Sequence, residues 1–311
     1  MTALLGILAY PGAQTSAVLG LRDLLTAAGR FQPDGGPPAM EVLILDGTAG
    51  APALERKLST LVLPPSLGQD LPDDPCGALR AWILDRHRDG ALLCSVCAGG
   101  FLLAETGLLA GRPATTHWAA KARFAARYPD VLLDTDRLLI DDGDLVTAGG
   151  LMAWIDLGLL LVGRYLGPGA VLATARLFLV DPGGREQRFY STFSPVLDHG
   201  DQAILRAQRW LHRHAAEAVD VPAMAAAAHL GERTFLRRFQ RAAGLRPTEY
   251  LQHLRVGRAR DLLERSDLAV DEIAWQVGYR DSGAFRKTFL RLMGLTPAEY
   301  RRRFGPRVAR P

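Results

Sequence analysis

The C-terminal third of the chain contains the same residue pattern twice, and this repeat is the feature that most constrains the fold. Seven residues recur at an offset of fifty positions. They are Phe235, Phe239, Gly244, Leu245, Pro247, Glu249 and Tyr250, which return as Phe285, Phe289, Gly294, Leu295, Pro297, Glu299 and Tyr300. A fixed period of this length is the signature of a duplicated structural unit.

Each copy has the pattern of a short helix, a tight turn and a second helix. In the first copy the apolar run Pro222–Leu230 precedes a helix over Gly231–Arg241, and in the second copy Val270–Val277 precedes Gly283–Met293. The paired Phe residues stand four apart, so they share one buried helix face. A long helix over Pro247–Arg265 is predicted between the copies, and a rigid helix there would fix the two units relative to each other.

Glycine and proline mark the ends of these helices. Gly244 and Gly294 stand where a helix ends in the left-handed conformation. Pro247 and Pro297 stand in the first turn of the next helix, where a missing N–H costs little. The helix ends indicated by glycine and proline therefore agree with the apolar periodicity in both copies.

The second helix of each copy carries basic side chains away from its Phe pair. Two tandem helix-turn-helix units would place these helices in the major groove of DNA. Arginine fits the edge of guanine, whereas contacts to phosphate position the protein without specifying sequence. We predict base contacts from Arg233, Arg237, Arg286 and Lys287, phosphate contacts from Arg238, Arg241 and Arg291, and further contacts from Thr234 and Ser282.

Charge is segregated along the chain. Residues 201–311 carry a net charge of +9 and residues 1–200 carry −5, which the overall value of +4 hides. A basic region of this kind favours binding to phosphates, and an acidic one does not. The charge therefore supports a nucleic-acid partner for the C-terminal part alone.

The N-terminal part alternates between strand and helix patterns, which predicts an α/β domain with a parallel sheet covered on both faces. The predicted domains are residues 1–194, a linker over 195–200, and an all-α domain over 201–311. Strands are expected at Leu4–Tyr10, Glu41–Leu45, Thr60–Leu63 and Ala91–Val96. Helices are expected at Thr15–Ala28, Ala78–Arg88, Gly100–Thr106, Trp118–Tyr128 and Leu151–Tyr165.

Composition indicates an ordinary globular protein, with 48% hydrophobic and 23% charged residues. No charged segment precedes the first apolar run, so no signal peptide is expected. The longest apolar helix contains Asp156 and Arg164 and is too short for a bilayer. Three cysteines exclude a four-thiolate zinc site in one chain and favour a reducing cytoplasm. No metal, cofactor or membrane partner is predicted.

One stretch of the first domain carries candidate chemistry. Cys97 follows a predicted strand, and Ala98 and Gly99 lead directly into a helix. Such an elbow exposes its side chain above the sheet edge, and the start of a helix favours a thiolate. His117 and Trp118 follow a further predicted strand and are expected to approach Cys97. We predict a ligand site of these five residues and expect Cys97 to react faster than Cys76.

The C-terminal residues resemble the DNA-binding domain of AraC/XylS-type transcription regulators. The resemblance covers about Asp201–Phe304. It is carried by Asp271-Glu272-Ile273-Ala274, Val277-Gly278-Tyr279, Ala284-Phe285-Arg286-Lys287-Thr288-Phe289 and Gly294-Leu295-Thr296-Pro297. It implies sequence-specific binding of double-stranded promoter DNA.

The N-terminal residues resemble the ThiJ/PfpI superfamily, relatives of class I glutamine amidotransferases. The resemblance covers about Ala3–Tyr165 and is carried by Cys97-Ala98-Gly99, Gly107-Leu108-Leu109, Thr115-Thr116-His117-Trp118 and Thr147-Ala148-Gly149. The order of the two domains resembles GlxA-like regulators. It implies a sensor for an unidentified small-molecule effector, a homodimer, and RNA polymerase as a further candidate partner.

Two departures from the superfamily pattern argue against catalysis. Catalytic members often carry His directly after the elbow Cys, where this chain has Ala98, and the loop Pro11–Ala17 lacks the carboxylate often found there. A catalytic Cys needs a base, and the base needs an orienting group. We therefore predict a degenerate elbow that is not an enzyme. The alternatives are a Cys-dependent amidase or peptidase fused to a DNA-binding domain, and a regulator that responds to oxidation of Cys97.

Overall fold

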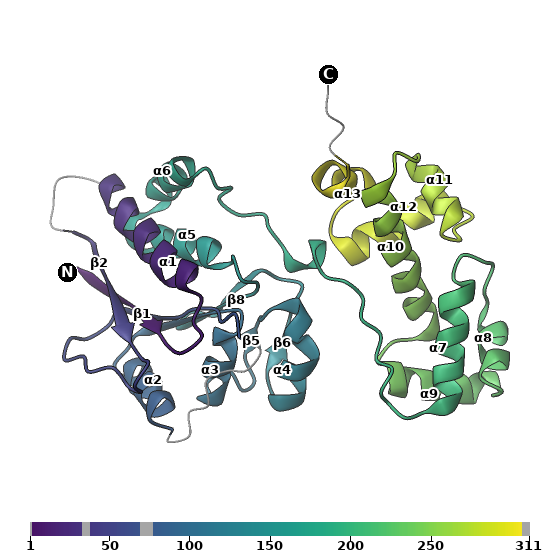
Figure 1. Ribbon diagram of the computed structural model, residues 1–311, viewed down its shortest axis with the longest axis horizontal. Coiled ribbons are helices and arrows are strands. Elements are labelled where there is room, and N and C mark those ends of the chain that lie inside the picture. Colours follow the sequence, from purple (N-terminus) through teal and green to yellow (C-terminus); the bar gives the residue numbers. More distant parts are fainter. Residues whose placement is uncertain (1, 33–37, 69–76, 307–311) are drawn as a thin grey trace. The chain divides into compact units, whose positions relative to one another are not determined.

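The computed structural model of the chain describes residues 2–32, 38–68 and 77–306, and Cys76 lies outside these ranges. It divides into two compact units, Met1–Arg188 and Phe189–Pro311 (Figure 1). Each unit has its own apolar core. The two units are therefore described separately.

The first unit is built on a six-stranded sheet with the order β2-β1-β3-β4-β8-β7. All neighbouring strands run parallel except β7, which is antiparallel to β8. The strands are β1 (Ala3–Ala9), β2 (Met40–Asp46), β3 (Thr60–Leu63), β4 (Leu92–Val96), β7 (Leu139–Asp141) and β8 (Leu145–Ala148). A small parallel pair, β5 (Pro113–Ala114) and β6 (Leu132–Leu133), lies outside this sheet.

Helices cover both faces of the sheet, as the alternating pattern predicted (Figure 1). One core contains side chains from α1 (Thr15–Ala28), α5 (Trp154–Leu166) and α6 (Pro168–Phe178). The other contains side chains from α2 (Ala78–Arg88), α3 (Gly99–Glu105) and α4 (Lys121–Arg127). Alternate residues of β1, β2, β3, β4 and β8 enter opposite cores, and this arrangement confirms the predicted α/β class.

Several elements differ from the sequence prediction. The sequence prediction gave no residue ranges for helix α6 or for strands β5 to β8. The predicted helix Trp118–Tyr128 begins as a 3-10 turn over Trp118–Ala120 before α4, and the predicted helix Leu151–Tyr165 begins only at Trp154. Strands β5 to β8 are only two to four residues long, too short to show a periodic pattern in the sequence, so tertiary pairing determines their conformation.

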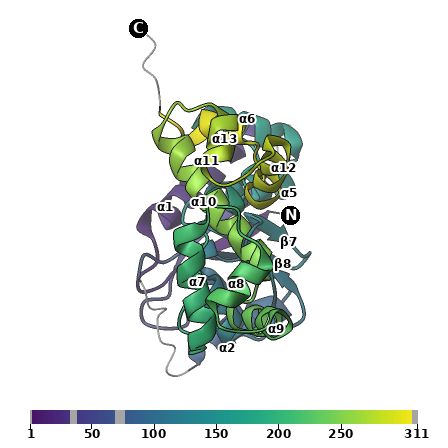
Figure 2. The same cartoon turned by 90° about the vertical axis from the view of Figure 1, so that its right-hand side faces the viewer.

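The second unit is entirely helical, and its longest helix, α10 (Pro247–Arg265), joins two helical groups (Figure 2). The first group comprises α7 (Gln202–His214), α8 (Val221–Ala227) and α9 (Glu232–Ala243). The second comprises α11 (Val270–Gln276), α12 (Ser282–Met293) and α13 (Pro297–Phe304). The α10 bounds match the prediction, whereas α7 was not predicted.

The boundary between the units differs from the predicted end of the first domain at residue 194 and the predicted linker over 195–200. Residues after Arg188 pack on the second unit instead. The Phe193 ring stacks on His253 with centroids 4.7 Å apart. The Arg260 guanidinium donates to the Ser191 carbonyl, and the Gln208 amide donates to the Val196 carbonyl at 3.0 Å. These contacts tie the segment 191–196 to α7 and α10.

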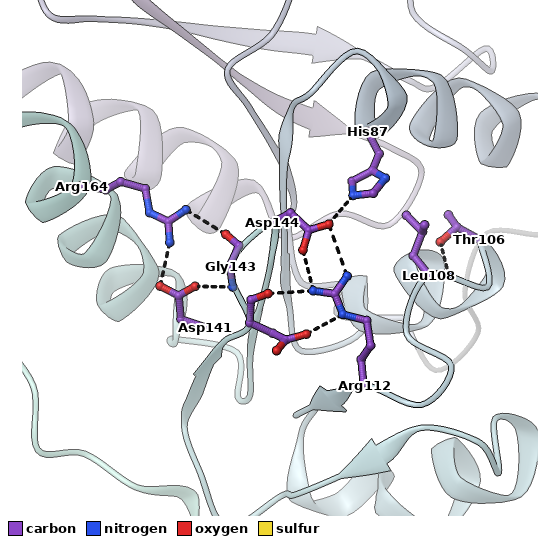
Figure 3. A network of polar contacts seen from close by, with 9 residues as sticks. His87, Thr106, Leu108, Arg112, Asp141, Gly143, Asp144 and Arg164 are labelled. Atoms are coloured by element: carbon purple, nitrogen blue, oxygen red, sulfur yellow. Dashed lines mark hydrogen bonds and ion pairs between the residues drawn. The ribbon is translucent and has the colours of Figure 1, made fainter.

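A network of charged side chains joins three segments of the first unit (Figure 3). Arg112 donates to the Asp142 carbonyl at 2.7 Å and forms ion pairs with the carboxylates of Asp142 and Asp144. His87, from the last turn of α2, contacts Asp144 at 2.7 Å. Hydrogen bonding from Arg112 lowers the pKa of the Asp144 carboxyl. This network links α2, Arg112 and the turn before β8 at one end of the sheet.

We predict that Arg112→Met lowers the free energy of unfolding at pH 7 by about 1–3 kcal/mol, because hydrogen bonds to charged groups are lost. The pKa of Asp144 is lower in the folded chain, so this stabilisation is present above the ordinary Asp pKa and fades as the pH falls below about 4. Urea unfolding at several pH values measures both effects. The matched control is Arg22→Met, which removes only an exposed pair with Asp23 and should cost less than about 1 kcal/mol. Equal losses in the two variants would contradict the prediction.

Candidate functional site

The strand–turn–helix elbow is present at Cys97. Strand β4 ends at Val96, Cys97 has a φ of +52°, and α3 begins at Gly99. A positive φ is strained for a residue with a side chain, so surrounding contacts must hold it. The Cys97 N–H donates to the Ala148 carbonyl at 2.7 Å, and the Thr116 hydroxyl donates to the Cys97 carbonyl at 2.8 Å.

Gly99 allows α3 to start directly against the neighbouring strand. A Cβ atom at this position would lie 2.8 Å from the Pro64 carbonyl oxygen and closer still to that of Leu63. Real Cβ atoms do not approach backbone oxygens at such distances, so only glycine fits without displacing the helix. The glycine after the elbow therefore has a packing role that is independent of catalysis.

The Cys97 thiol is buried, which corrects the expectation of an exposed, readily ionised sulfur. Its residue is 7% exposed, and burial raises the pKa of the thiol to about 11. Backbone hydrogen bonds from Ala98 and Gly150 act in the opposite direction but are outweighed. The loss of hydration thus exceeds the benefit of the helix start, because a thiolate in an apolar setting is costly.

His117 lies in the segment next to the elbow, but its contacts are not those of a general base for Cys97. Its Nδ1 accepts the Ala119 N–H at 3.1 Å, so this nitrogen carries a lone pair, and burial lowers the pKa of the imidazole. Its ring packs beside Trp118 with centroids 5.4 Å apart. Within the described residues, no hydrogen bond joins His117 to Cys97. The five predicted ligand-site residues thus lie on two segments that meet through Thr116.

Gln187 organises the segment that carries His117 and was missed from the sequence. This side chain is 2% exposed, and its amide donates to the Thr116 carbonyl at 2.8 Å and to the Thr115 hydroxyl at 3.0 Å. Its carbonyl oxygen accepts the Trp118 N–H at 3.0 Å. A lone glutamine far along the chain gives no local signal, because its role depends on tertiary contacts.

Asp156, the acid nearest to the predicted site motifs, does not orient His117. Both carboxylate oxygens pair with Arg185, one of them accepting from its Nε at 3.2 Å. Arg185 also donates to the Met152 carbonyl at 3.3 Å. The described part of the elbow therefore lacks a carboxylate–imidazole–thiol relay.

The second candidate site is the basic surface of α9 and α12. The Phe pairs are fully buried, as predicted. Seven of the nine predicted DNA-contact residues are exposed: Arg233, Thr234, Arg237, Arg241, Arg286, Lys287 and Arg291. Arg238 and Ser282 are half-buried. The buried and basic faces of both helices are thus separated as the spacing indicated.

Some of these basic side chains already have partners within the chain. Arg238 makes a two-pronged pair with Asp201, the residue that caps α7, at 2.6 and 2.9 Å. Arg286 pairs with Asp271 at 2.6 Å, and Arg291 donates to the Gln252 side chain at 2.7 Å.

The other basic side chains of this surface are unpaired. None of Arg233, Arg237, Arg241 and Lys287 forms an ion pair with any residue of the described ranges. A phosphate or base can thus bind these four without breaking an existing bond.

Two kinds of feature do not occur within residues 2–32, 38–68 and 77–306. No helix there combines the length and apolar character needed to cross a bilayer. No cluster of three or more His, Cys, Asp or Glu side chains suited to a metal ion occurs in the same residues.

Comparison with known families agrees with this two-part architecture. Residues 56–164 match the DJ-1/PfpI family, and residues 224–303 match a helix-turn-helix domain. The chain thus combines a DJ-1/PfpI domain with a helix-turn-helix domain, and GlxA is among the regulators that it is similar to. These matches confirm the two resemblances seen in the sequence.

Three regulators are among its relatives. HTH-type transcriptional regulator ArgR of Pseudomonas aeruginosa is 27% identical over 96% of this chain and 92% of its own length. GlxA of Rhizobium meliloti is 28% identical over 70% of this chain and 67% of its own length. GbdR of Pseudomonas aeruginosa is 27% identical over 69% of this chain, and the match spans only 58% of GbdR.

We predict that Cys97 reacts slowly with iodoacetamide at pH 7.5 and that its rate keeps rising up to about pH 11, because burial disfavours the reactive thiolate. Peptide mass spectrometry of the labelled full-length chain separates Cys97 from Cys94 only if Cys94→Ser is used as background, since both lie on one peptide. Free glutathione is the reference thiol. A rate for Cys97 at pH 7.5 that equals or exceeds the glutathione rate would contradict the prediction.

Proposed function

We propose that this protein is a sequence-specific DNA-binding transcription regulator whose first unit senses a small molecule. The observation that carries the proposal is the pair of basic helices, α9 and α12, each buried on its Phe face and exposed on its Arg face. Helices of this kind bind the major groove, and two of them read successive segments of one DNA face. The regulator names of its relatives support the same function.

The paired and unpaired side chains refine the proposed DNA contacts. Arg233, Arg237 and Lys287 are the proposed base readers that need no rearrangement, and Arg241 is the proposed phosphate contact. Arg286 must exchange Asp271 for a base, and Arg238 must leave Asp201. The Arg238 pair fixes the start of α7, so we propose that Arg238 positions α9 more than it binds phosphate.

We propose that the first unit is not an enzyme. Hydrolysis through Cys97 needs a thiolate and a base that is itself oriented. The raised pKa of Cys97 and the engagement of Asp156 with Arg185 both oppose such a relay. The elbow of Cys97, Ala98, Gly99, His117 and Trp118 remains a proposed ligand site. A homodimer in the cytoplasm, acting at promoters together with RNA polymerase, completes the proposal.

We predict that Arg237→Ala relaxes base preference, whereas Arg241→Ala weakens binding to all sequences equally. A lost base contact should cost about 1–3 kcal/mol at its own position, because the bidentate pairing to guanine is specific. Selection from a randomised DNA library, followed by fluorescence anisotropy with the full-length chain, measures both effects. The footprints of α9 and α12 should lie about 10 base pairs apart. Equal losses on specific and random DNA for both variants would overturn the assignment.

We predict that Asp271→Asn strengthens DNA binding. The substitution removes the carboxylate that holds Arg286 and also removes a negative charge beside the phosphates. Anisotropy should show a lower Kd for the selected DNA, because Arg286 reaches its base without first breaking the ion pair with Asp271. The matched control is Asp220→Asn, which changes an exposed helix cap on α8 by the same charge. An unchanged Kd for Asp271→Asn would show that Arg286 takes no part in binding.

A further inference from the structure

The first unit contains a cavity of about 490 Å³ that the elbow residues do not line. Its walls come from the β7 strand, from one face of α5, from α6 and from the segment 182–186. The apolar part of the lining includes Leu138, Leu159, Leu160 and Val171. This volume lies within the range of small-molecule sites, which are mostly apolar with a few placed polar groups.

The charged residues of this cavity leave one cation without a partner. Asp156 pairs with Arg185, and Glu186 pairs with Arg188 at 2.5 Å. Arg137 also lines the cavity and forms no ion pair with any residue in the described part of the chain. A guanidinium beside an apolar wall is suited to a carboxylate, which it binds through two parallel hydrogen bonds.

We propose that this cavity binds a small amphipathic monocarboxylate, with its apolar body on the leucine and valine wall and its carboxylate on Arg137. The wall contributes through burial of apolar surface, and Arg137 selects for the negative charge. Asp156 disfavours a second negative charge on the ligand, because it lines the same cavity. The expected ligand class is therefore aliphatic or aromatic acids with a single carboxylate.

The cavity also adjoins the segment through which the chain leaves the first unit. The Asp156–Arg185 pair holds residues 182–186 to α5, and Gly183 and Gly184 both have positive φ. Gln187 lies two residues after Arg185, and its side chain forms hydrogen bonds to the segment that carries His117. The second unit begins at Phe189. A ligand that contacts residues 182–186 thus acts on the segment that leads directly to Gln187 and then to the start of the second unit, and this regulatory step rests on the proposed function.

The binding step is tested by isothermal titration calorimetry of the full-length chain with octanoate. We expect saturable binding of octanoate and much weaker binding of octan-1-ol, which has the same apolar body without the charge. Arg137→Gln should weaken octanoate binding by at least about tenfold, since a charge-assisted pair is lost. The matched control, Arg176→Gln, removes an exposed arginine of α6 outside the cavity lining and should leave binding unchanged.

Equal affinity of the wild-type chain and Arg137→Gln for octanoate would overturn the proposal, as would the absence of saturable binding. Val171→Phe provides an independent test, because the larger side chain fills the cavity and should abolish binding of both probes. Circular dichroism checks that this variant folds. If it does not fold, the comparison of Arg137→Gln with Arg176→Gln still decides the proposal, because both change exposed side chains.

The regulatory step is separated from the binding step by a DNA-binding measurement. Octanoate should change the Kd of the full-length chain for its selected DNA, and Arg137→Gln should remove this response without changing the Kd measured in the absence of octanoate. Octanoate binding without any effect on DNA affinity would overturn the regulatory step alone. Absence of DNA binding altogether would overturn the proposed function and leave the carboxylate site in place.

Discussion

Each basic helix is held in place by the same aromatic packing, and the rest of the second unit depends on it. In the first group the ring centroid of Phe239 lies 5.3 Å from that of Phe235, and the Phe239 ring meets Tyr250 edge-on with centroids 5.3 Å apart. In the second group the equivalent contacts of Phe289 are 5.7 Å to Phe285 and 5.5 Å to Tyr300. Edge-to-face aromatic pairs gain energy beyond the area they bury. The packing fixes which face of each helix remains outside, and the arginines occupy that face.

The same packing explains why the second unit was largely predictable. Most of the residues that recur in the sequence are the aromatic residues of the two cores and the Gly and Pro residues that end and begin helices. Gly244 and Gly294 have φ of +71° and +70°, as the helix-end interpretation requires. Helix α7 was missed because it precedes the repeat and because the polar Gln208 interrupts its apolar stripe. Gln208 is fully buried, where it binds the Val196 carbonyl, and no local pattern reveals that partner.

In the first unit too, features set by the local sequence were predictable, and features set by long-range contacts were not. Helices α1 and α2 match their predicted bounds, because apolar spacing and turn residues define them locally. The predicted exposure and ready ionisation of the Cys97 thiol were wrong, because ionisation depends on how deeply the fold buries the sulfur and not on its place before a helix. The elbow turn itself was correctly predicted from the strand, Cys97 and Gly99. Its electrostatics were not, since desolvation and the Asp156–Arg185 pair arise only from tertiary packing.

The structure explains why the elbow motif is needed for the fold, whatever chemistry the thiol carries out. Gly99 is required because α3 starts against the carbonyls that follow β3, and the strained φ of Cys97 turns the chain sharply enough to make that start possible. Thr116 and Gln187 then bind the elbow and its neighbouring segment through buried hydrogen bonds, which are costly to leave unmade. These residues are therefore needed for folding whether or not a thiolate forms. A Cys-Ala-Gly sequence after a strand is thus sufficient to indicate the turn, whereas the ionisation of the thiol depends on burial, and the nearby Asp156 is held by Arg185.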